Sequence, residues 1–422
     1  MRYHRPRGTQ DILPAEAARW RHVESTFRRI CAVYGYGEIR TPTFEPTELF
    51  VRSVGEHTDI VSKEMYEVVP SRAGEEREPL TLRPEGTAPT LRAYVQHSMW
   101  KLAPVTKLYY LAAIFRHERP QAGRLREHHQ AGIEALGSDD PALDVETIRL
   151  GLDYLAALGI TGTTLWINSV GCAVCRPLLR QELRDALRER LPRLCADCQR
   201  RYEVNPLRIL DCKVEDWDAL GVTLPDLIAC QCADCQRHFG AVRALLDDAA
   251  IEYFVQPRLV RGLDYYTRTA FEVTHPALGA QNTLIGGGRY DGLVEELGGP
   301  PTPGIGFGSG IERVLLVCEA LGIEFPSEAT RPVFVITLGE AARRVGLRLL
   351  GELRRAGIAS ETDYTGRSIK AQMRAAHRAN ARIALILGEE EVAQGAVSWR
   401  DLDAATQETL PQQAALRRLG VG

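Results

Sequence analysis

The feature that most constrains this 422-residue chain is a run of alternating glycines, Gly304-Ile305-Gly306-Phe307-Gly308-Ser309-Gly310, followed by Ile311-Glu312-Arg313. Successive side chains of a β-strand point to opposite faces, so this strand has one face without side chains. A helix is expected to follow, and its N-terminal end beside Arg313 favours an anion. The run therefore predicts a bare surface for a flat base next to an anion site. A tight strand crossing that needs small residues is the alternative.

A second segment, residues 114–126, reads as a strand that runs into a loop rich in arginine: Arg116, Arg119, Arg124 and Arg126. Guanidinium groups bind phosphate oxygens in a bidentate manner. Glu118 lies two residues after Arg116, on the same strand face, where it can hold the base in place. The pattern indicates a phosphate site, and a surface ion-pair ladder is the competing interpretation.

Three further segments carry chemistry. Residues 259–267 place Arg261, Tyr265 and Tyr266 in what reads as a buried strand. Residues 286–292 are too rich in glycine for a regular strand, so we expect their backbone to approach a ligand closely. Residues 82–87 set a carboxylate and a hydroxyl at a junction of strand and helix, which suits an ammonium group, although Thr87 could equally be a helix cap.

Composition excludes several classes of protein. Hydrophobic residues make up 45% and charged residues 25% of the chain, which is typical of a globular protein and not of a disordered one. No apolar stretch approaches the ~20 residues that span a bilayer, and residues 1–10 lack the apolar core of a signal peptide. We therefore expect a cytoplasmic protein without a membrane. The net charge of −3 does not by itself predict a nucleic-acid partner.

The order of helical and strand-like patterns predicts an α+β body over residues 1–325, with strands at 80–82, 107–115, 130–136, 165–169, 259–266, 270–274 and 304–310. Residues 170–255 interrupt this body with cysteine clusters and arginine-rich helices, so we interpret them as an inserted, mostly helical module. Residues 331–422 alternate regularly between strand and helix, which predicts a separate small α/β domain.

Eight of the ten cysteines lie between residues 172 and 235. In a chain expected to be cytoplasmic, such clusters indicate thiols or metal ligands and not disulfides. Cys172-x-x-Cys175 and Cys195-x-x-Cys198, nineteen residues apart, approach a four-cysteine zinc spacing. Cys212, Cys230, Cys232 and Cys235 form a possible second set. Reduced, packed cysteines without metal are the alternative.

These segments together resemble a known family. The Phe115-Arg116-x-Glu118 loop and the glycine strand ending in Glu312-Arg313 resemble motifs 2 and 3 of class II aminoacyl-tRNA synthetases. Residues 259–266 and 286–291 resemble the two signatures of the histidyl-tRNA synthetase family. The resemblance implies a class II catalytic domain with an antiparallel sheet and flanking helices, followed by a C-terminal α/β anticodon-binding domain.

The resemblance also implies a reaction: L-histidine and ATP form histidyl-adenylate and pyrophosphate, and the histidyl group then passes to tRNA(His). It implies ATP as a substrate with Mg²⁺, and a homodimer with residues 15–42 at the interface. The implied catalytic residues are Arg116, Arg261 and Arg313. The implied histidine-binding residues are Glu85, Thr87, Gln130, Glu134, Arg261, Tyr265 and Tyr266, and the implied ATP-binding residues are Arg116, Glu118, Arg124, Gly308, Gly310 and Arg313.

A non-catalytic relative has the same body: the regulatory subunit of ATP phosphoribosyltransferase. That protein typically lacks the anticodon-binding domain and parts of the adenylation site. Because this chain keeps the three arginines and residues 332–422, the sequence favours the ligase.

Overall fold

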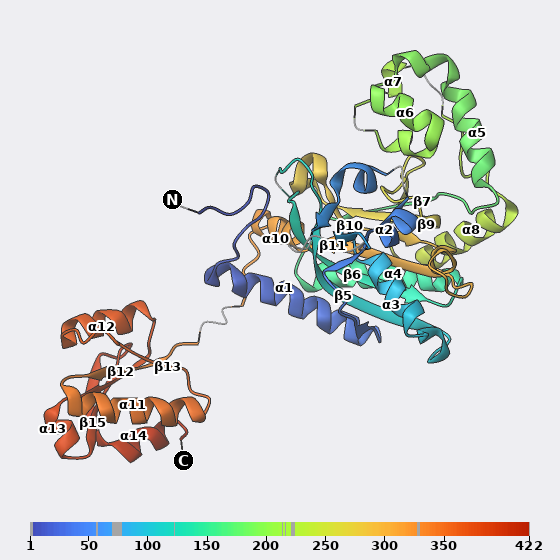
Figure 1. Ribbon diagram of the computed structural model, residues 1–422. Helices are drawn as coiled ribbons and strands as arrows, with labels where there is room; N and C mark the ends of the chain where they lie inside the picture. Colours follow the sequence, from blue (N-terminus) through green and yellow to red (C-terminus); the bar gives the residue numbers. More distant parts are fainter. Residues whose placement is uncertain are drawn as a thin grey trace. The chain divides into compact units, whose positions relative to one another are not determined.

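The chain forms two units in a computed structural model, which describes residues 3–421 except 56–57, 70–77, 122, 213, 216, 221–223 and 327–329. The first unit is Met1–Pro326 and the second is Ser327–Gly422 (Figure 1). Among the described residues, no helix combines the length and the apolar character that crossing a membrane requires.

The first unit is built on a mixed but mainly antiparallel sheet. The helices are α1 (Pro14–Val33), α2 (Thr47–Val54), η1 (Ile60–Glu64), α3 (Thr87–Gln96), η2 (Met99–Lys101), α4 (Pro141–Ala157), α5 (Arg176–Leu187), η3 (Arg188–Arg193), α6 (Ala196–Val204), η4 (Pro206–Asp211), α7 (Trp217–Leu220), α8 (Ala233–Asp248), η5 (Pro276–Gln281), α9 (Leu293–Glu296) and α10 (Ile311–Ala320). The strands are β1 (Gly37–Glu38), β2 (Phe44–Pro46), β3 (Tyr66–Val68), β4 (Leu80–Leu82), β5 (Thr106–Phe115), β6 (Glu127–Leu136), β7 (Thr164–Ser169), β8 (Phe254–Val255), β9 (Thr267–Thr274), β10 (Thr283–Arg289) and β11 (Gly304–Gly310).

Eight of these strands form one sheet in the order β1-β5-β6-β11-β10-β9-β7-β8. Only the outer pairs β1–β5 and β7–β8 are parallel. Helices α1, α4 and α10 pack together over this sheet, and their apolar side chains share one core with it, for example Phe27, Tyr154 and Phe307. Strands β2, β4 and β3 form a small second sheet beside α2 and α3. The predicted class of fold, an antiparallel sheet with flanking helices, is confirmed.

Two local predictions were wrong. Residues 259–266 form a loop with turns and not a strand, because Gly262 and the turn after Pro257 interrupt the ladder before β9 begins at Thr267. Residues 286–292 were predicted to be too glycine-rich for a regular strand, but residues 286–289 belong to β10, which is paired with β9 and β11. Glycine is needed there because the neighbouring strands leave no room for a side chain. A Cβ at Gly287, for example, would clash with the backbone oxygen of Gly306.

The inserted module extends from the end of β7 through α5, α6 and α7 to α8. Its tip has a small core of its own, with Leu187, Tyr202 and Trp217 among its members. Helix α8 differs, because its Phe239 and Val242 are buried in the main core and it packs on α4. The cysteine-rich region predicted over 170–255 therefore combines a separate tip with a helix of the catalytic body.

The second unit has a five-stranded sheet in the order β13-β12-β14-β15-β16. Its elements are β12 (Val333–Thr337), α11 (Glu340–Arg355), β13 (Ser360–Thr362), α12 (Ile369–Arg378), β14 (Ile383–Leu387), α13 (Glu389–Ala393), β15 (Ala396–Asp401), β16 (Thr406–Pro411) and α14 (Gln412–Arg418). Strands β12, β13 and β14 are parallel, as the alternating pattern predicts, whereas β15 and β16 form an antiparallel hairpin that the pattern did not reveal.

Candidate active site

One cavity of the first unit collects the chemistry-bearing segments. It lies on β6, β10 and β11, and the loops before α3, after β5 and before β9 enclose it. Twelve predicted site residues line it: Glu85, Thr87, Arg116, Glu118, Arg124, Gln130, Arg261, Tyr265, Tyr266, Gly308, Gly310 and Arg313. The thirteenth, Glu134, is buried on β6 and hydrogen-bonded to Thr87 of the lining.

The glycines of β11 make room for β6. Gly306 pairs with Glu134 in the sheet, and a Cβ at Gly306 would clash with that carboxylate and with the Ile133 backbone oxygen. A Cβ at Gly308 would clash with the amide of Gln130. Gly310 is different, since the nearest atom to its Cβ would be Arg313 Cγ at 3.8 Å. The bare face predicted from the sequence therefore accommodates two polar side chains of β6, and it is open only at Gly310.

Glu134 is the centre of a buried hydrogen-bond network. Thr87 Oγ1 donates to its Oε1 at 2.7 Å, Tyr110 OH donates to the same oxygen at 3.4 Å, and Tyr290 OH donates to Oε2. Burial raises the pKa of Glu134 to about 8, because the charged form loses its hydration. The site therefore holds a carboxyl group that titrates near neutral pH with three hydroxyl partners.

Glu85 closes the N-terminal end of α3. Its two carboxylate oxygens accept hydrogen bonds from the backbone N–H groups of Thr87 and Ala88, both at 2.7 Å. Burial raises the pKa of Glu85, although these two bonds favour its charged form. The side chain is thus fixed by the helix end while it lines the cavity.

Two arginines of the loop after β5 share one acid. Glu118 forms an ion pair with Arg124 and lies 3.9 Å from Arg116. Arg116 Nε donates to the Pro84 carbonyl oxygen at 2.7 Å, which holds this guanidinium against the segment that carries Glu85. Because β5 ends at Phe115, Arg116 and Glu118 lie in the loop and not on one strand face as the sequence predicted, but both side chains still reach the cavity wall.

Two more arginines line the cavity, one from the loop before β9 and one from α10. Arg261 forms an ion pair with Glu272 of β9. Arg313 donates from Nε to the Gly123 carbonyl oxygen and from Nη1 to the Thr283 carbonyl oxygen, both at 2.9 Å. Four guanidinium groups therefore line one cavity, and such a cluster favours a ligand with several negative charges.

Two buried polar atoms of the cavity, Gln130 Oε1 and Arg261 Nε, have no hydrogen-bond partner within the described part of the chain. Buried polar groups are normally paired, so these atoms are available to a ligand. Beside them, the ring centroids of Tyr265 and Tyr266 are 4.7 Å apart, and the ring of Tyr265 packs edge to face against that of Tyr290. The cavity thus offers an aromatic wall and free polar atoms next to its arginines.

Tyr110, His128 and Tyr290 belong to this site but were not predicted from the sequence. Tyr110 and Tyr290 contact Glu134, and a Cβ at Gly86 or Gly132 would clash with the Tyr110 ring. His128 lines the cavity, and burial, followed by Arg116 and Arg313, lowers its pKa to about 3. Tyr290 lies within the glycine-rich segment, so that segment was the available signal, whereas nothing local marks Tyr110.

The predicted metal ligands are divided differently from the expectation. Cys172 and Cys175 lie with Cys232 and Cys235, whereas Cys195 and Cys198 lie with Cys212 and Glu215. The proposed set of Cys172, Cys175, Cys195 and Cys198 is therefore wrong. Helix α5 separates its two halves, while the return of the chain into α8 brings residues 232–235 back to residues 172–175.

Comparisons with known proteins agree with this architecture. The family profile described as histidyl-tRNA synthetase matches residues 8–314, and an anticodon binding domain profile matches residues 332–420. A histidine–tRNA ligase from Desulforamulus reducens is 51% identical over 98% of this chain and 97% of its own, and one from Moorella thermoacetica is 52% identical over 98% and 96%. The crystal structure of apo histidyl-tRNA synthetase from S. aureus covers 99% of this chain and is itself covered completely, with 35% identity and a TM-score of 0.82.

Proposed function

The chain belongs to the histidyl-tRNA synthetase family, and we propose that it ligates L-histidine to tRNA(His) through a histidyl-adenylate. A carboxylate oxygen of histidine attacks the α-phosphorus of ATP, the bond to the bridging oxygen breaks, and pyrophosphate leaves. The terminal hydroxyl of the tRNA then attacks the activated carbonyl carbon and releases AMP. The observation that carries the proposal is one cavity with four arginines at its wall and a buried acid–hydroxyl network beneath it.

The arginines suit the charge of the adenylation step. We assign Arg116 to the α-phosphate and the histidine carboxylate, and Arg313 to the γ-phosphate. Arg261 supplies a fixed cation near the α-phosphate. Catalysis of this kind rests on alignment of the attack and on neutralising charge as it develops. The free Nε of Arg261 supports the assignment, since a buried donor is available to the reacting groups.

The network beneath supplies recognition of the imidazole ring. We assign Glu134 and Tyr266 to the two ring nitrogens, while Tyr290 and Thr87 hold the Glu134 carboxylate in place. Glu85, Thr87 and Gln130 take the α-ammonium group. An amino-acid substrate whose side chain cannot pair with this network leaves buried polar groups unsatisfied. Its kcat/KM is then expected to be lower than that of histidine by a factor of ~10⁴–10⁵. No editing step is then required.

Mg²⁺ is used by this family together with ATP. Glu118 fits the preference of Mg²⁺ for oxygen ligands, because it presents a carboxylate in the lining of the cavity. When bound, the ion would offset the charge of the ATP phosphates, and Arg116 and Arg313 act on the oxygens that remain.

The second unit supplies the contact to the tRNA anticodon. It matches the anticodon binding domain profile, and we assign it to the anticodon of the tRNA.

We propose a cytoplasmic homodimer with residues 15–42 at its interface. The resemblance of this segment to motif 1 of class II synthetases supports the dimer, and its apolar Val33, at the end of α1, is 74% exposed.

The proposal is tested by ATP–pyrophosphate exchange with the purified protein and no tRNA. Exchange that requires histidine and ignores other amino acids is the expected result. If histidine binds but no exchange occurs, the regulatory subunit of ATP phosphoribosyltransferase becomes the better description. That alternative is less supported, because Arg116, Arg261 and Arg313 all face one cavity.

A further inference from the structure

The cysteines of the inserted module form two separate groups of potential metal ligands. The first, here called the clasp, contains Cys172, Cys175, Cys232 and Cys235. The second, here called the tip group, contains Cys195, Cys198, Cys212 and Glu215. Within each group the ligand atoms all lie within 4.8 Å of one another. Cys230 belongs to neither group, although it is only two residues from Cys232.

The sulfur separations of the clasp fit a tetrahedral ion. Cys172 Sγ lies 3.8 Å from both Cys175 Sγ and Cys232 Sγ, and Cys175 Sγ lies 3.8 Å from Cys235 Sγ. Sulfur atoms bound at about 2.3 Å around a tetrahedral Zn²⁺ are about 3.8 Å apart. A disulfide would need a separation of about 2.05 Å. All ten cysteines are free thiols, so the clasp has the geometry of a tetrathiolate site.

The tip group offers three sulfurs and one carboxylate. Cys195 Sγ lies 3.8 Å from Cys212 Sγ. The backbone N–H of Cys195 donates to Glu215 Oε1 at 2.7 Å, which holds this carboxylate beside the sulfurs. The backbone N–H of Val214 lies 3.4 Å from Cys212 Sγ, where it can stabilise a thiolate. Sulfur and carboxylate are both ligands of Zn²⁺ in proteins.

We propose that this chain binds two Zn²⁺ ions, one in the clasp through four thiolates and one in the tip group through three thiolates and Glu215. The proposal concerns the structure of the module, and it holds whether or not the chain ligates histidine to tRNA. Each ion replaces the thiol protons of its ligands, so binding releases protons and weakens at low pH.

The two ions act on different parts of the molecule. The tip core spans residues 187–220, below the length of about 40 residues under which a fold usually needs a metal or a disulfide. The clasp instead joins the start of the module to the start of α8 and thereby closes the loop between residues 175 and 232. The tip ion therefore organises a core, whereas the clasp ion fixes where the module leaves and re-enters the body.

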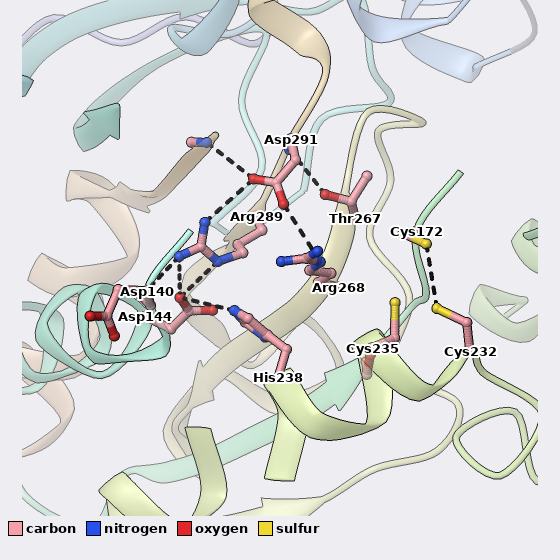
Figure 2. A network of polar contacts seen from close by, with 12 residues as sticks. Asp140, Asp144, Cys172, Cys232, Cys235, His238, Thr267, Arg268, Arg289 and Asp291 are labelled. Atoms are coloured by element: carbon pink, nitrogen blue, oxygen red, sulfur yellow. Dashed lines mark hydrogen bonds and ion pairs between the residues drawn. The ribbon is translucent and has the colours of Figure 1, made fainter. Parts of the chain in front are cut away.

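The clasp is also linked to the active-site sheet. Figure 2 shows His238, one helical turn after Cys235 on α8, directed at Asp144 of α4, and Asp144 paired with Arg289 of β10. His238 Nε2 lies 3.8 Å from Asp144 Oδ2, and Arg289 Nε donates to the same oxygen at 2.7 Å. A clasp ion thus anchors helix α8, which packs against β9 and against α4, the helix whose Asp144 holds Arg289 beside Tyr290.

The test is the zinc content of the full chain, purified without chelators, measured by elemental analysis. We expect two ions per chain for the natural protein and for the matched control Cys230→Ser. We expect one ion for Cys232→Ser/Cys235→Ser and one for Cys195→Ser/Cys198→Ser. Less than half an ion per chain in the natural protein would overturn the proposal. A value of one, abolished by either double substitution, would overturn the claim of two independent sites.

A second measurement avoids variants that fail to fold. The natural protein is alkylated under native conditions with and without a chelator, and the modified cysteines are mapped by mass spectrometry. We expect the seven clustered cysteines to be protected until the chelator is added, and the partly buried Cys230 to react at the same rate in both conditions. Equal reactivity of the clustered cysteines with and without the chelator would contradict metal binding.

Discussion

The active-site cavity and the tip of the inserted module are stabilised in different ways. The cavity lies on β6, β11 and β10, each paired on both sides within an eight-stranded sheet. The tip has short helices and seven buried apolar residues (Leu187, Leu194, Cys198, Tyr202, Ile209, Trp217 and Leu220). Backbone pairing and a large core can hold unpaired polar atoms ready for a ligand, whereas a small core needs its polar and sulfur groups for its own stability.

This difference indicates where substitutions act. In the cavity, replacing a polar side chain should alter function more than stability, since the surrounding sheet remains, whereas a substitution that crowds the sheet itself should destabilise it. In the module, a change should alter stability or metal content more than chemistry. The following predictions test this separation, beginning with the largest expected effect.

Glu134→Ala should reduce kcat/KM for histidine in pyrophosphate exchange by about 10³–10⁴-fold, with little change in KM for ATP. The substitution removes an imidazole partner and leaves Thr87 Oγ1 and Tyr290 OH without their acceptor in a buried site. Equal losses for histidine and ATP would contradict the assignment of Glu134 to the imidazole.

Glu134→Gln is the control that keeps the shape and removes the titration. The folded-state pKa of Glu134, about 8, lies above the ordinary value of 4.5. The carboxyl group therefore contributes most to stability below pH 4.5, and this contribution is lost as the pH rises through about 8. We expect the unfolding temperature of the ligand-free natural protein to fall between pH 5 and 8 more than that of the variant. Parallel pH profiles would contradict a neutral, buried Glu134.

Arg261→Ala should lower the rate of adenylation by about 10²–10³-fold while ATP binding changes much less, because the fixed cation acts mainly on charge that develops in the transition state. Pre-steady-state formation of adenylate and equilibrium binding of ATP measure the two quantities. Arg258→Ala, on an exposed part of the same loop, is the control and should leave both unchanged. Comparable losses in rate and in ATP affinity would remove Arg261 from its proposed role.

Gly306→Ala should destabilise the catalytic unit by about 1–3 kcal/mol, since the new methyl group would clash with the Ile133 backbone oxygen and with Glu134. Gly310→Ala is the matched control on the same strand. Its methyl group would meet nothing closer than Arg313 Cγ at 3.8 Å. The free energy of unfolding of this variant should therefore stay within about 0.5 kcal/mol of that of the natural protein. Thermal or denaturant unfolding distinguishes the two, and equal destabilisation would mean that the clash is relieved by a small shift.

The glycine strand also shows how far sequence alone could reach. The glycine alternation of residues 304–310 and similar patterns predicted most of the strands and the fold class, because alternation follows from strand geometry. The charged segments, among them Arg116 with Glu118, predicted most of the cavity lining. The register between two strands cannot be read from the sequence of either strand alone. For this reason the sequence did not reveal Tyr110 as a partner of Glu134. Spacing likewise could not reveal that Cys232 returns to Cys172, because that contact depends on the path of the chain around α5.

The smallest expected effect concerns the contact between the tip and the body. Arg201 donates to Asp59 at 3.0 Å, and the Asp59 side chain is 35% exposed. Arg201→Ala should lower the unfolding midpoint by no more than about 2 °C, because an ion pair of this exposure is worth less than about 1 kcal/mol. Histidine-dependent exchange should change less than about twofold, since the sheet supports the cavity independently of the tip.

The matched control is Arg200→Ala, whose guanidinium lies 3.8 Å from Asp59 and pairs mainly with Asp197 at 2.9 Å. A loss of exchange with Arg201→Ala as large as that with Arg261→Ala would show that the module and the cavity are not separable, because the tip would then determine the position of the catalytic loop.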